Sequence, residues 1–179
     1  MTTHNTQRIA FAIMLPRHIA TLLHAIQQKN NLPLWQPKID LHITLVSPFT
    51  TSETIGLLRH RMMPIKIRRK PFRVVIACFG RFDNEESIFY AAVKPSVSLT
   101  TLADDVLTAV IDLHRPRTRP FIPHVTLAAP ASRITVNRYL KQTQKDIPYL
   151  IFTCDRFSML KFDEKLCKWN ITHTFKFIT

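Results

Sequence analysis

The sequence reads Leu41-His42-Ile43-Thr44-Leu45, and its second half repeats the pattern as Pro123-His124-Val125-Thr126-Leu127. Successive side chains of an extended strand point to opposite faces, so each histidine shares a face with the threonine two residues later. The intervening apolar residues lie on the other face. Each stretch therefore predicts a half-buried strand, and two such strands facing one another would place two imidazoles and two hydroxyls around one cleft.

The composition indicates a globular chain with an anionic partner. Its 179 residues are 46% hydrophobic and 21% charged, which is enough for a hydrophobic core. The formal net charge of +13, with basic clusters at 66–73 and 115–119, favours nucleic acid as the partner, although charge can also serve solubility alone. With only two glycines, the chain has neither a Walker loop nor a dinucleotide-binding fingerprint. A bound phosphate must therefore be held by side chains or by strand and helix ends.

The cysteines and apolar runs predict an intracellular protein. Cys78, Cys154 and Cys167 form an odd set without CxxC spacing, as expected of reduced thiols in the cytoplasm. The apolar run 9–15 is too short to span a bilayer and is closed by Pro16, so we expect no membrane association. We also expect a monomer with no cofactor and no bound metal ion.

Hydrophobic periodicity predicts two similar halves. Helices are expected at 17–29, 51–63, 99–113 and 132–145, and strands at 9–15, 40–46, 72–79, 87–94, 122–128, 149–160 and 166–178. Pro48 and Pro130 are expected to end the two motif strands. The order strand, helix, motif strand, helix, strand occurs in 9–79 and again in 87–160, and a hairpin over 149–178 closes the chain. We therefore predict one bilobal α+β domain over 1–179, with two pseudo-symmetric antiparallel-sheet lobes, helices on the outside and a central cleft.

The two His-x-Thr-Leu stretches, with Pro48-Phe49 after the first, resemble the two-histidine phosphoesterase superfamily. The branch they are most similar to is the LigT-like RNA 2′,3′-cyclic phosphodiesterases, also called the 2′-5′ RNA ligase family. The order of elements resembles this family along most of the chain. Members often carry an arginine in a Thr-Leu-Ala-Arg run, where this chain has Ala129. A phosphate or sugar contact made by that arginine is then missing, or is supplied by Arg119, Arg133 or another basic side chain.

The residue types suit acid–base chemistry on a phosphodiester. Imidazole serves as base and as acid near neutral pH, so His42 and His124 on opposite sides of a phosphorus atom could act without metal. The hydroxyls of Thr44 and Thr126 could donate hydrogen bonds to the non-bridging oxygens. The resemblance implies these roles for the four residues, with RNA or nucleotide 2′,3′-cyclic phosphate ends as substrates and ligation as the reverse reaction. Which histidine is the acid stays open.

The recognition of a nucleobase also stays open, and so do three alternative functions. The aromatic residues near the motif strands could stack a base or could be core residues; they are Trp35, Phe49, Phe82 and Phe121. The chain could be a non-catalytic RNA-binding module or a 2′-5′ oligonucleotide phosphodiesterase. A zinc site formed by His42, His124 and a cysteine lacks close ligand spacing. A single strand histidine is more often structural, but the matched pair favours catalysis.

Overall fold

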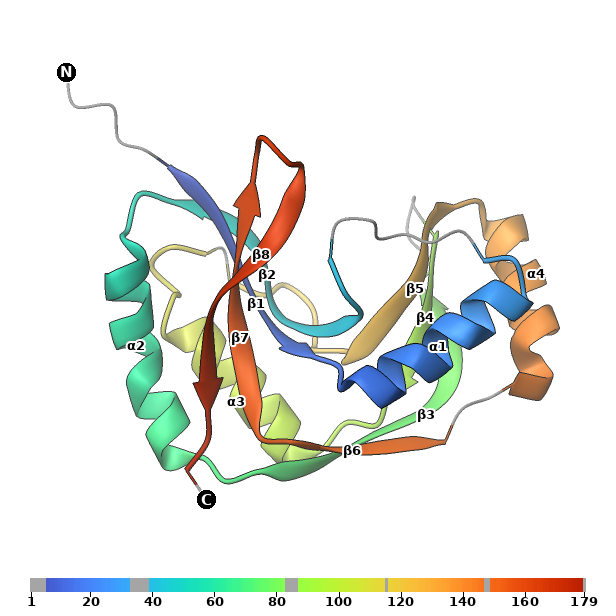
Figure 1. Cartoon of the computed structure of the whole chain (residues 1–179), viewed down its shortest axis with the longest axis horizontal. Helices are drawn as coiled ribbons and strands as arrows, with labels where there is room; N and C mark the ends of the chain where they lie inside the picture. The colour runs from blue at the N-terminus through green and yellow to red at the C-terminus, as the bar shows by residue number, and fades with distance from the viewer. Residues whose placement is uncertain (1–5, 33–38, 83–86, 115, 147–148, 179) are drawn as a thin grey trace.

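The computed structural model describes residues 6–32, 39–82, 87–114, 116–146 and 149–178 (Figure 1). These residues form four α-helices, eight strands and one short 3₁₀ helix. The strands are β1 (Gln7–Met14), β2 (His42–Thr51), β3 (Phe72–Phe82), β4 (Ser87–Val93), β5 (His124–Ala131), β6 (Leu150–Cys154), β7 (Arg156–Asp163) and β8 (Lys168–Lys176). The helices are α1 (Arg17–Lys29), α2 (Ile55–Arg68), α3 (Val97–Thr108), α4 (Arg133–Thr143) and the 3₁₀ helix η1 (Gln144–Asp146).

The strands form two four-stranded antiparallel sheets. Sheet A has the order β2-β1-β7-β8, and sheet B has the order β5-β4-β3-β6. Each motif strand, β2 or β5, lies at the edge of its own sheet, and the two strands contact one another where the sheets meet. The predicted α+β architecture with two antiparallel-sheet lobes is confirmed.

The end of the chain differs from the prediction. The expected strand 149–160 is two strands, since β6 pairs with β3 in sheet B whereas β7 pairs with β1 and β8 in sheet A. The alternation of buried residues shifts by one position at the junction between β6 and β7. Phe152 and Cys154 are buried before the junction, and Phe157 and Met159 are buried after it. A one-residue shift in a period-2 pattern reverses the faces of a strand, which lets the chain pass from one sheet to the other. The hairpin itself is β7–β8.

The helices interlock the two sheets. Helix α1 follows β1 of sheet A but packs on sheet B, where the Gln27 side-chain amide donates a 2.7 Å hydrogen bond to the Leu127 carbonyl of β5. Helix α3 follows β4 of sheet B but contacts β2 of sheet A. Sheet B also contains β3, the last strand of the first sequence repeat. Neither sheet is therefore built from one repeat alone.

Both motif strands continue through the proline that was expected to end them. In β2, Phe49 pairs with Ile9 and Val46 with Phe11, so Ser47 and Pro48 lie opposite a single residue. In β5, Ala131 pairs with Ser87 and Ala128 with Phe89, so that Ala129 and Pro130 also lie opposite a single residue. Proline has no N–H to donate, but a bulge on an edge strand requires none. Each bulge falls at the same distance after its motif histidine.

Two helices also differ from their predicted limits. Helix α2 begins only at Ile55 because β2 continues to Thr51, and it passes Pro64 to end at Arg68. A proline inside a helix is costly, but the following turn buries Ile65 in the core. Helix α3 ends at Thr108 rather than at 113, and Val110 in the turn beyond it is still buried.

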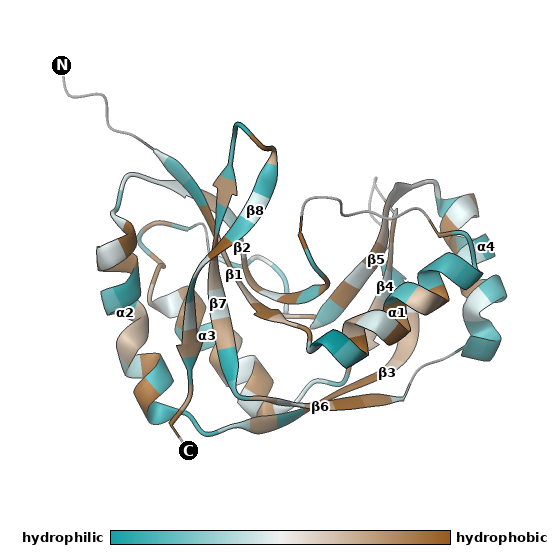
Figure 2. Cartoon of the chain, in the orientation of Figure 1, coloured by the Kyte–Doolittle hydropathy of each residue, from teal (hydrophilic) through white to brown (hydrophobic). Residues whose placement is uncertain are grey.

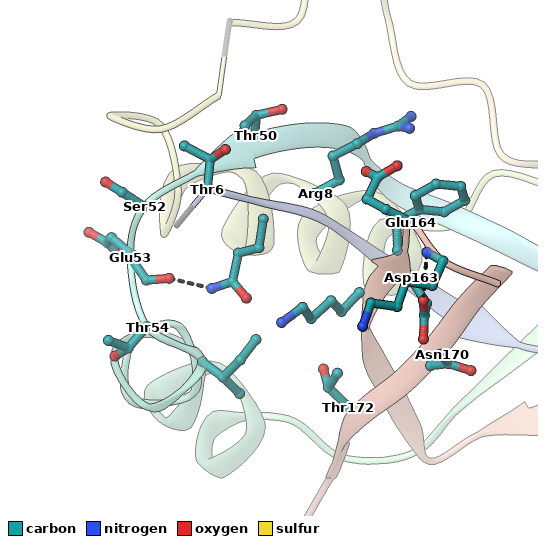
Figure 3. Close-up of a pocket in the computed structure, with 15 residues that line it drawn as sticks. Thr6, Arg8, Thr50, Ser52, Glu53, Thr54, Asp163, Glu164, Asn170 and Thr172 are labelled. Carbon is teal, nitrogen blue, oxygen red and sulfur yellow. Dashed lines mark hydrogen bonds between the residues drawn. The ribbon is translucent and has the colours of Figure 1, made fainter. Parts of the chain in front are cut away.

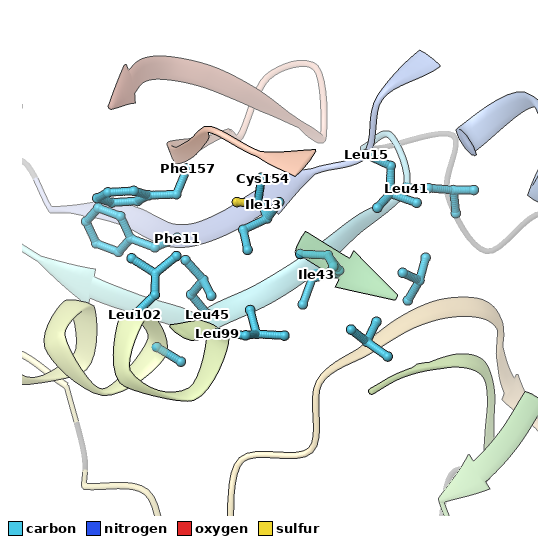
Figure 4. Close-up of a cluster of buried hydrophobic side chains, with 14 of the residues drawn as sticks. Phe11, Ile13, Leu15, Leu41, Ile43, Leu45, Leu99, Leu102, Cys154 and Phe157 are labelled. Atoms are coloured by element: carbon cyan, nitrogen blue, oxygen red, sulfur yellow. The ribbon is translucent and has the colours of Figure 1, made fainter. Parts of the chain in front are cut away.

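One hydrophobic core joins the two sheets and the helices. In β1 the alternate residues Ile9, Phe11 and Ile13 are buried in this core, with side chains of β2, α3 and β7 around them (Figure 4). Strand β6 and the adjoining part of β3 are hydrophobic, whereas α4 is largely hydrophilic (Figure 2). The other face of β1 carries the small residues Ala10 and Ala12, which belong to a separate apolar cluster with Leu160 and Trp169. Small side chains on this face leave room for a cavity.

Candidate active site

Both motif histidines are the first residues of their strands and are held in the same way. His42 Nδ1 lies 2.9 Å from the Asp40 carbonyl oxygen, and His124 Nδ1 lies 2.7 Å from the Ile122 carbonyl oxygen. A carbonyl oxygen only accepts hydrogen bonds, so Nδ1 must carry the proton in each bond. In the neutral ring, Nε2 is then the nitrogen with a lone pair. Each histidine can therefore exchange a proton with a ligand through Nε2.

Partial burial sets the protonation of the pair. Burial lowers the pKa of His42. The hydrogen bond to the Asp40 carbonyl raises this pKa in part, and the neighbouring charge of His124 lowers it again. Burial likewise lowers the pKa of His124, and the bond to the Ile122 carbonyl opposes the change. Since a proton on His124 disfavours one on His42, the pair resists double protonation.

The two strands line a common cavity of about 370 Å³. It receives His42 and Thr44 from β2 and Thr126 from β5; the other lining residues are Ala10, Phe11, Ala12, Ile39, Pro48, Leu160 and Trp169. His124 is on the same face of β5 as Thr126, because the two are two residues apart in the strand. Three of the four motif side chains thus line one cavity, and the fourth, His124, lies on the same face of β5 as Thr126. The volume is that of a small-molecule site.

Aromatic side chains surround His124. The Phe82 ring meets the imidazole edge-on at a centroid distance of 4.8 Å, and the Tyr90 ring lies at 5.3 Å. Tyr90 lies over Gly80, where an added Cβ would come within 2.6 Å of the ring. Glycine at position 80 is therefore required for this placement of Tyr90.

Some residues at the site were missed by the motif analysis. Tyr90 pairs with Thr126 across β4 and β5, and Trp169 lines the cavity from β8. Both lie far from the motifs in the sequence. The alternation of β4 could have indicated that Tyr90 faces away from the core, but only the register of the sheets places either ring near a histidine.

The other predicted substrate-binding residues lie elsewhere. Phe49 is buried in the core, where its ring stacks on Phe11 at 6.4 Å. Arg119 is exposed before β5, and Arg133 is exposed at the first position of α4. None of these residues lines the cavity. The Phe121 ring lies under the Arg117 guanidinium at 4.9 Å, and Trp35 is outside the described residues.

A larger hollow of about 1090 Å³ lies at the far end of sheet A (Figure 3). It is polar and of mixed charge: its basic residues Arg8, Lys161 and Lys165 are accompanied by Glu53, Asp163 and Glu164. Neither motif histidine lines it, and its mixed charge gives it no preference for an anion. The smaller cavity is therefore the candidate active site.

Over the residues that the structure describes, no three His, Cys, Asp or Glu side chains are grouped as they would be around a metal ion, so the zinc hypothesis gains no support there. In the same residues, no helix has the length and apolar character needed to cross a membrane.

Comparison with known proteins identifies the family. A Bacillus cytotoxicus protein named as a candidate phosphoesterase is 27% identical over 135 residues, which cover 75% of this chain and 77% of that protein. The crystal structure of E. coli LigT complexed with 3′-AMP matches with a TM-score of 0.73 at 18% identity, over 98% of this chain and all of LigT. A Thermus thermophilus structure matches with a TM-score of 0.65 at 20% identity, over 94% of this chain and 97% of its own. The model of the 2′-5′ RNA ligase superfamily matches residues 15–166, so the chain belongs to the 2′-5′ RNA ligase superfamily.

Proposed function

We propose that this protein is a cyclic phosphodiesterase that opens RNA or nucleotide 2′,3′-cyclic phosphates by two-histidine acid–base catalysis. The observation that supports this best is the equivalence of His42 and His124. Each begins an edge strand, and each donates Nδ1–H to the carbonyl two residues earlier, which leaves Nε2 for proton exchange. A structural role for one histidine would not account for the same arrangement at the second.

The hydrolysis requires the enzyme to accept one proton and to donate another. In hydrolysis, one imidazole accepts a proton from water as the water oxygen forms a bond to phosphorus. The bond from phosphorus to one ribose oxygen breaks, and the other histidine, as imidazolium, gives its Nε2 proton to that oxygen. The enzyme ends with the proton on the opposite histidine, so the reverse reaction uses the same groups in exchanged roles. The singly protonated pair is the active form.

The threonines support the developing charge. Thr44 and Thr126 line the cavity from opposite sheets, and their hydroxyls can donate to the two non-bridging oxygens of a phosphate held between the strands. Among the residues that the structure describes, the lining includes no lysine or arginine. The imidazolium and these hydroxyls are therefore the groups in the cavity that would neutralise the phosphate, consistent with Ala129 standing where relatives often carry an arginine.

Alanine substitutions of the two histidines test this proposal. We expect His42→Ala and His124→Ala each to lower kcat on 2′,3′-cyclic AMP by at least about 100-fold, because a positioned general acid or base contributes a rate factor of at least this order. The matched control is His173→Ala, because His173 lies on β8 against Phe175 and outside the cavity. Assays in EDTA test independence of metal. Wild-type-like turnover in either cavity variant, with intact circular dichroism, would overturn the assignment.

A further inference from the structure

Each motif strand contains one residue, directly after the motif threonine, that has no partner in its sheet. In β2, Thr44 and Val46 pair with neighbouring residues of β1, so that Leu45 is left over between them. Leu127 has the equivalent place in β5. Both leucine side chains are buried in the core. An extra residue of this kind falls outside the regular pairing of the ladder, so its backbone carbonyl needs a hydrogen-bond donor from elsewhere.

A side chain from the opposite half of the sequence binds each of these two carbonyls. The Leu127 carbonyl, in the second half, accepts from the amide of Gln27 in the first. The Leu45 carbonyl, in the first half, accepts a 3.2 Å hydrogen bond from Nη2 of Arg117 in the second. The two bonds thus occupy equivalent places and run in opposite directions between the halves. A chance contact of one arginine would not have this counterpart.

Two further contacts fix the Arg117 guanidinium. Its Nη1 lies 3.0 Å from the Asp104 carboxylate of α3, the helix against which the Leu45 side chain is buried (Figure 4). The guanidinium also lies 4.9 Å from the ring centre of Phe121, in the segment 116–123 that leads into His124. Arg117 therefore joins the strand of the first motif histidine to α3 and to the segment before the second motif histidine.

We propose that Arg117 is a positioning residue that sets the separation of His42 and His124. This inference rests on the proposed function and adds a residue to it. Among the described residues, β2 and β5 share no backbone ladder, because each is the edge of a different sheet. Arg117 does not line the cavity, so it acts through the backbone of Leu45. An acid and a base serve one phosphorus only when both are within reach of it, and a shift of about 1 Å can lower the rate about 100-fold.

The chain offers a matched control in Arg69, which makes the same two kinds of bond elsewhere. Its guanidinium donates to the Ser98 carbonyl at 3.0 Å and to the carboxylate of Asp105, the residue after Asp104 in α3. Its side chain is 12% exposed, against 25% for that of Arg117. The carbonyl that it binds belongs to α3 and not to a motif strand. Removal of Arg69 therefore breaks an equivalent set of bonds and leaves both motif strands in place.

The first test compares kcat and KM for 2′,3′-cyclic AMP in Arg117→Met and Arg69→Met. Methionine removes the donors and keeps an unbranched apolar side chain. We expect Arg117→Met to lower kcat by about 10-fold or more, because the acid and the base lose their alignment. KM should stay within about two-fold, because every residue that lines the cavity is unchanged. Arg69→Met should leave both constants at their wild-type values.

Arg117→Lys is the conservative variant, and it also serves if the methionine variant does not fold. An ammonium group keeps one donor centre but lacks the planar fork that reaches both the Leu45 carbonyl and Asp104. Its kcat should therefore lie between those of Arg117→Met and the wild type. Thermal melting by circular dichroism checks the fold of each variant. Equal losses of kcat in Arg117→Met and Arg69→Met would overturn the inference, as would a wild-type kcat in both Arg117 variants.

A second test needs no turnover and separates this inference from the proposed function. The neighbouring charge of His124 lowers the pKa of His42, so His124→Ala should raise that pKa in an NMR titration of the imidazole. The interaction between two charges weakens with distance, so the rise should be smaller in the Arg117→Met background than in the wild-type or Arg69→Met background.

The same rise in all three backgrounds would show that Arg117 does not set the separation of the histidines. A wild-type protein that turned over no cyclic phosphate would reject the proposed function alone, and the titration would still decide the role of Arg117.

Discussion

At the scale of single residues, the site depends on where the histidines stand in their strands. Each is the first residue of an edge strand, so the carbonyl two residues earlier is outside the sheet and accepts from Nδ1. The local backbone thus selects the same tautomer twice. Ile43 and Val125, the next residues, are fully buried, which anchors each imidazole at the rim of the core. A histidine placed one residue later would face that core.

The lowered pKa values of both histidines predict an acid-side pH optimum. The active form carries one proton on the pair, and the pKa of each member is held below its ordinary value of 6.5. As the pH rises, the last proton therefore leaves the pair before an ordinary histidine would lose its own, so kcat/KM on 2′,3′-cyclic AMP should be highest below pH 6.5 and fall towards pH 8. A bound phosphate favours the imidazolium, so kcat should have its optimum at a higher pH than kcat/KM.

Initial rates between pH 4.5 and 9 test this expectation, with His173→Ala as a control that leaves the profile in place. A maximum of kcat/KM above pH 7.5 would contradict it.

At the scale of elements, the bulges and the helices depend on one another. Leu127 of β5 has no partner in the β4–β5 register, because the register shifts next to it. Its carbonyl accepts instead from Gln27, a buried residue of α1 whose own Oε1 is 2.8 Å from His24 Nδ1. A side chain from the first half of the chain thus completes the hydrogen bonding of the strand that carries His124. The register shift at Leu127 and the crossing of α1 onto sheet B form one structural unit.

Gln27→Met removes this bond and keeps the length of the side chain. A buried carbonyl left without its partner costs about 1–3 kcal/mol, so we expect the free energy of unfolding in urea to fall by that amount. Gln28→Met, in the adjacent exposed position, is the matched control and should change stability by less than about 0.5 kcal/mol. Equal effects of the two substitutions would show that the bond contributes nothing.

Elements with strong local signals were predictable, and pairings between distant strands were not. The apolar spacing of Ile19 and Leu23 gave the limits of α1, and the His-x-Thr alternation gave the exposed face of both motif strands. Pro48 was misinterpreted because its effect depends on an edge position that only the sheet order defines. Trp169 was missed for the same reason, since its place at the cavity follows from pairing with Phe162 on a strand next to β1.

At the scale of the whole molecule, we expect the net charge of +13 to attract long polyanions such as RNA. The candidate cavity has no lysine or arginine among the described residues that line it, so we expect a mononucleotide to meet little of this charge there. Exposed basic side chains, such as those of Arg119 and Arg133, do not line the cavity. The net charge should therefore affect how strongly RNAs of different lengths bind more than it affects catalysis.

Salt should consequently separate a short substrate from a long one. Each phosphate neutralised by a protein cation on a single strand contributes a slope of about −0.7 to the logarithm of affinity against the logarithm of salt concentration. We expect KM for a ten-nucleotide RNA with a 2′,3′-cyclic end to rise steeply between 50 and 300 mM KCl, and KM for 2′,3′-cyclic AMP to rise little. Turnover numbers should stay similar, because the reacting groups lie inside the cavity. Parallel slopes for the two substrates would show that the basic surface has no part in binding RNA, and the excess charge would then serve solubility.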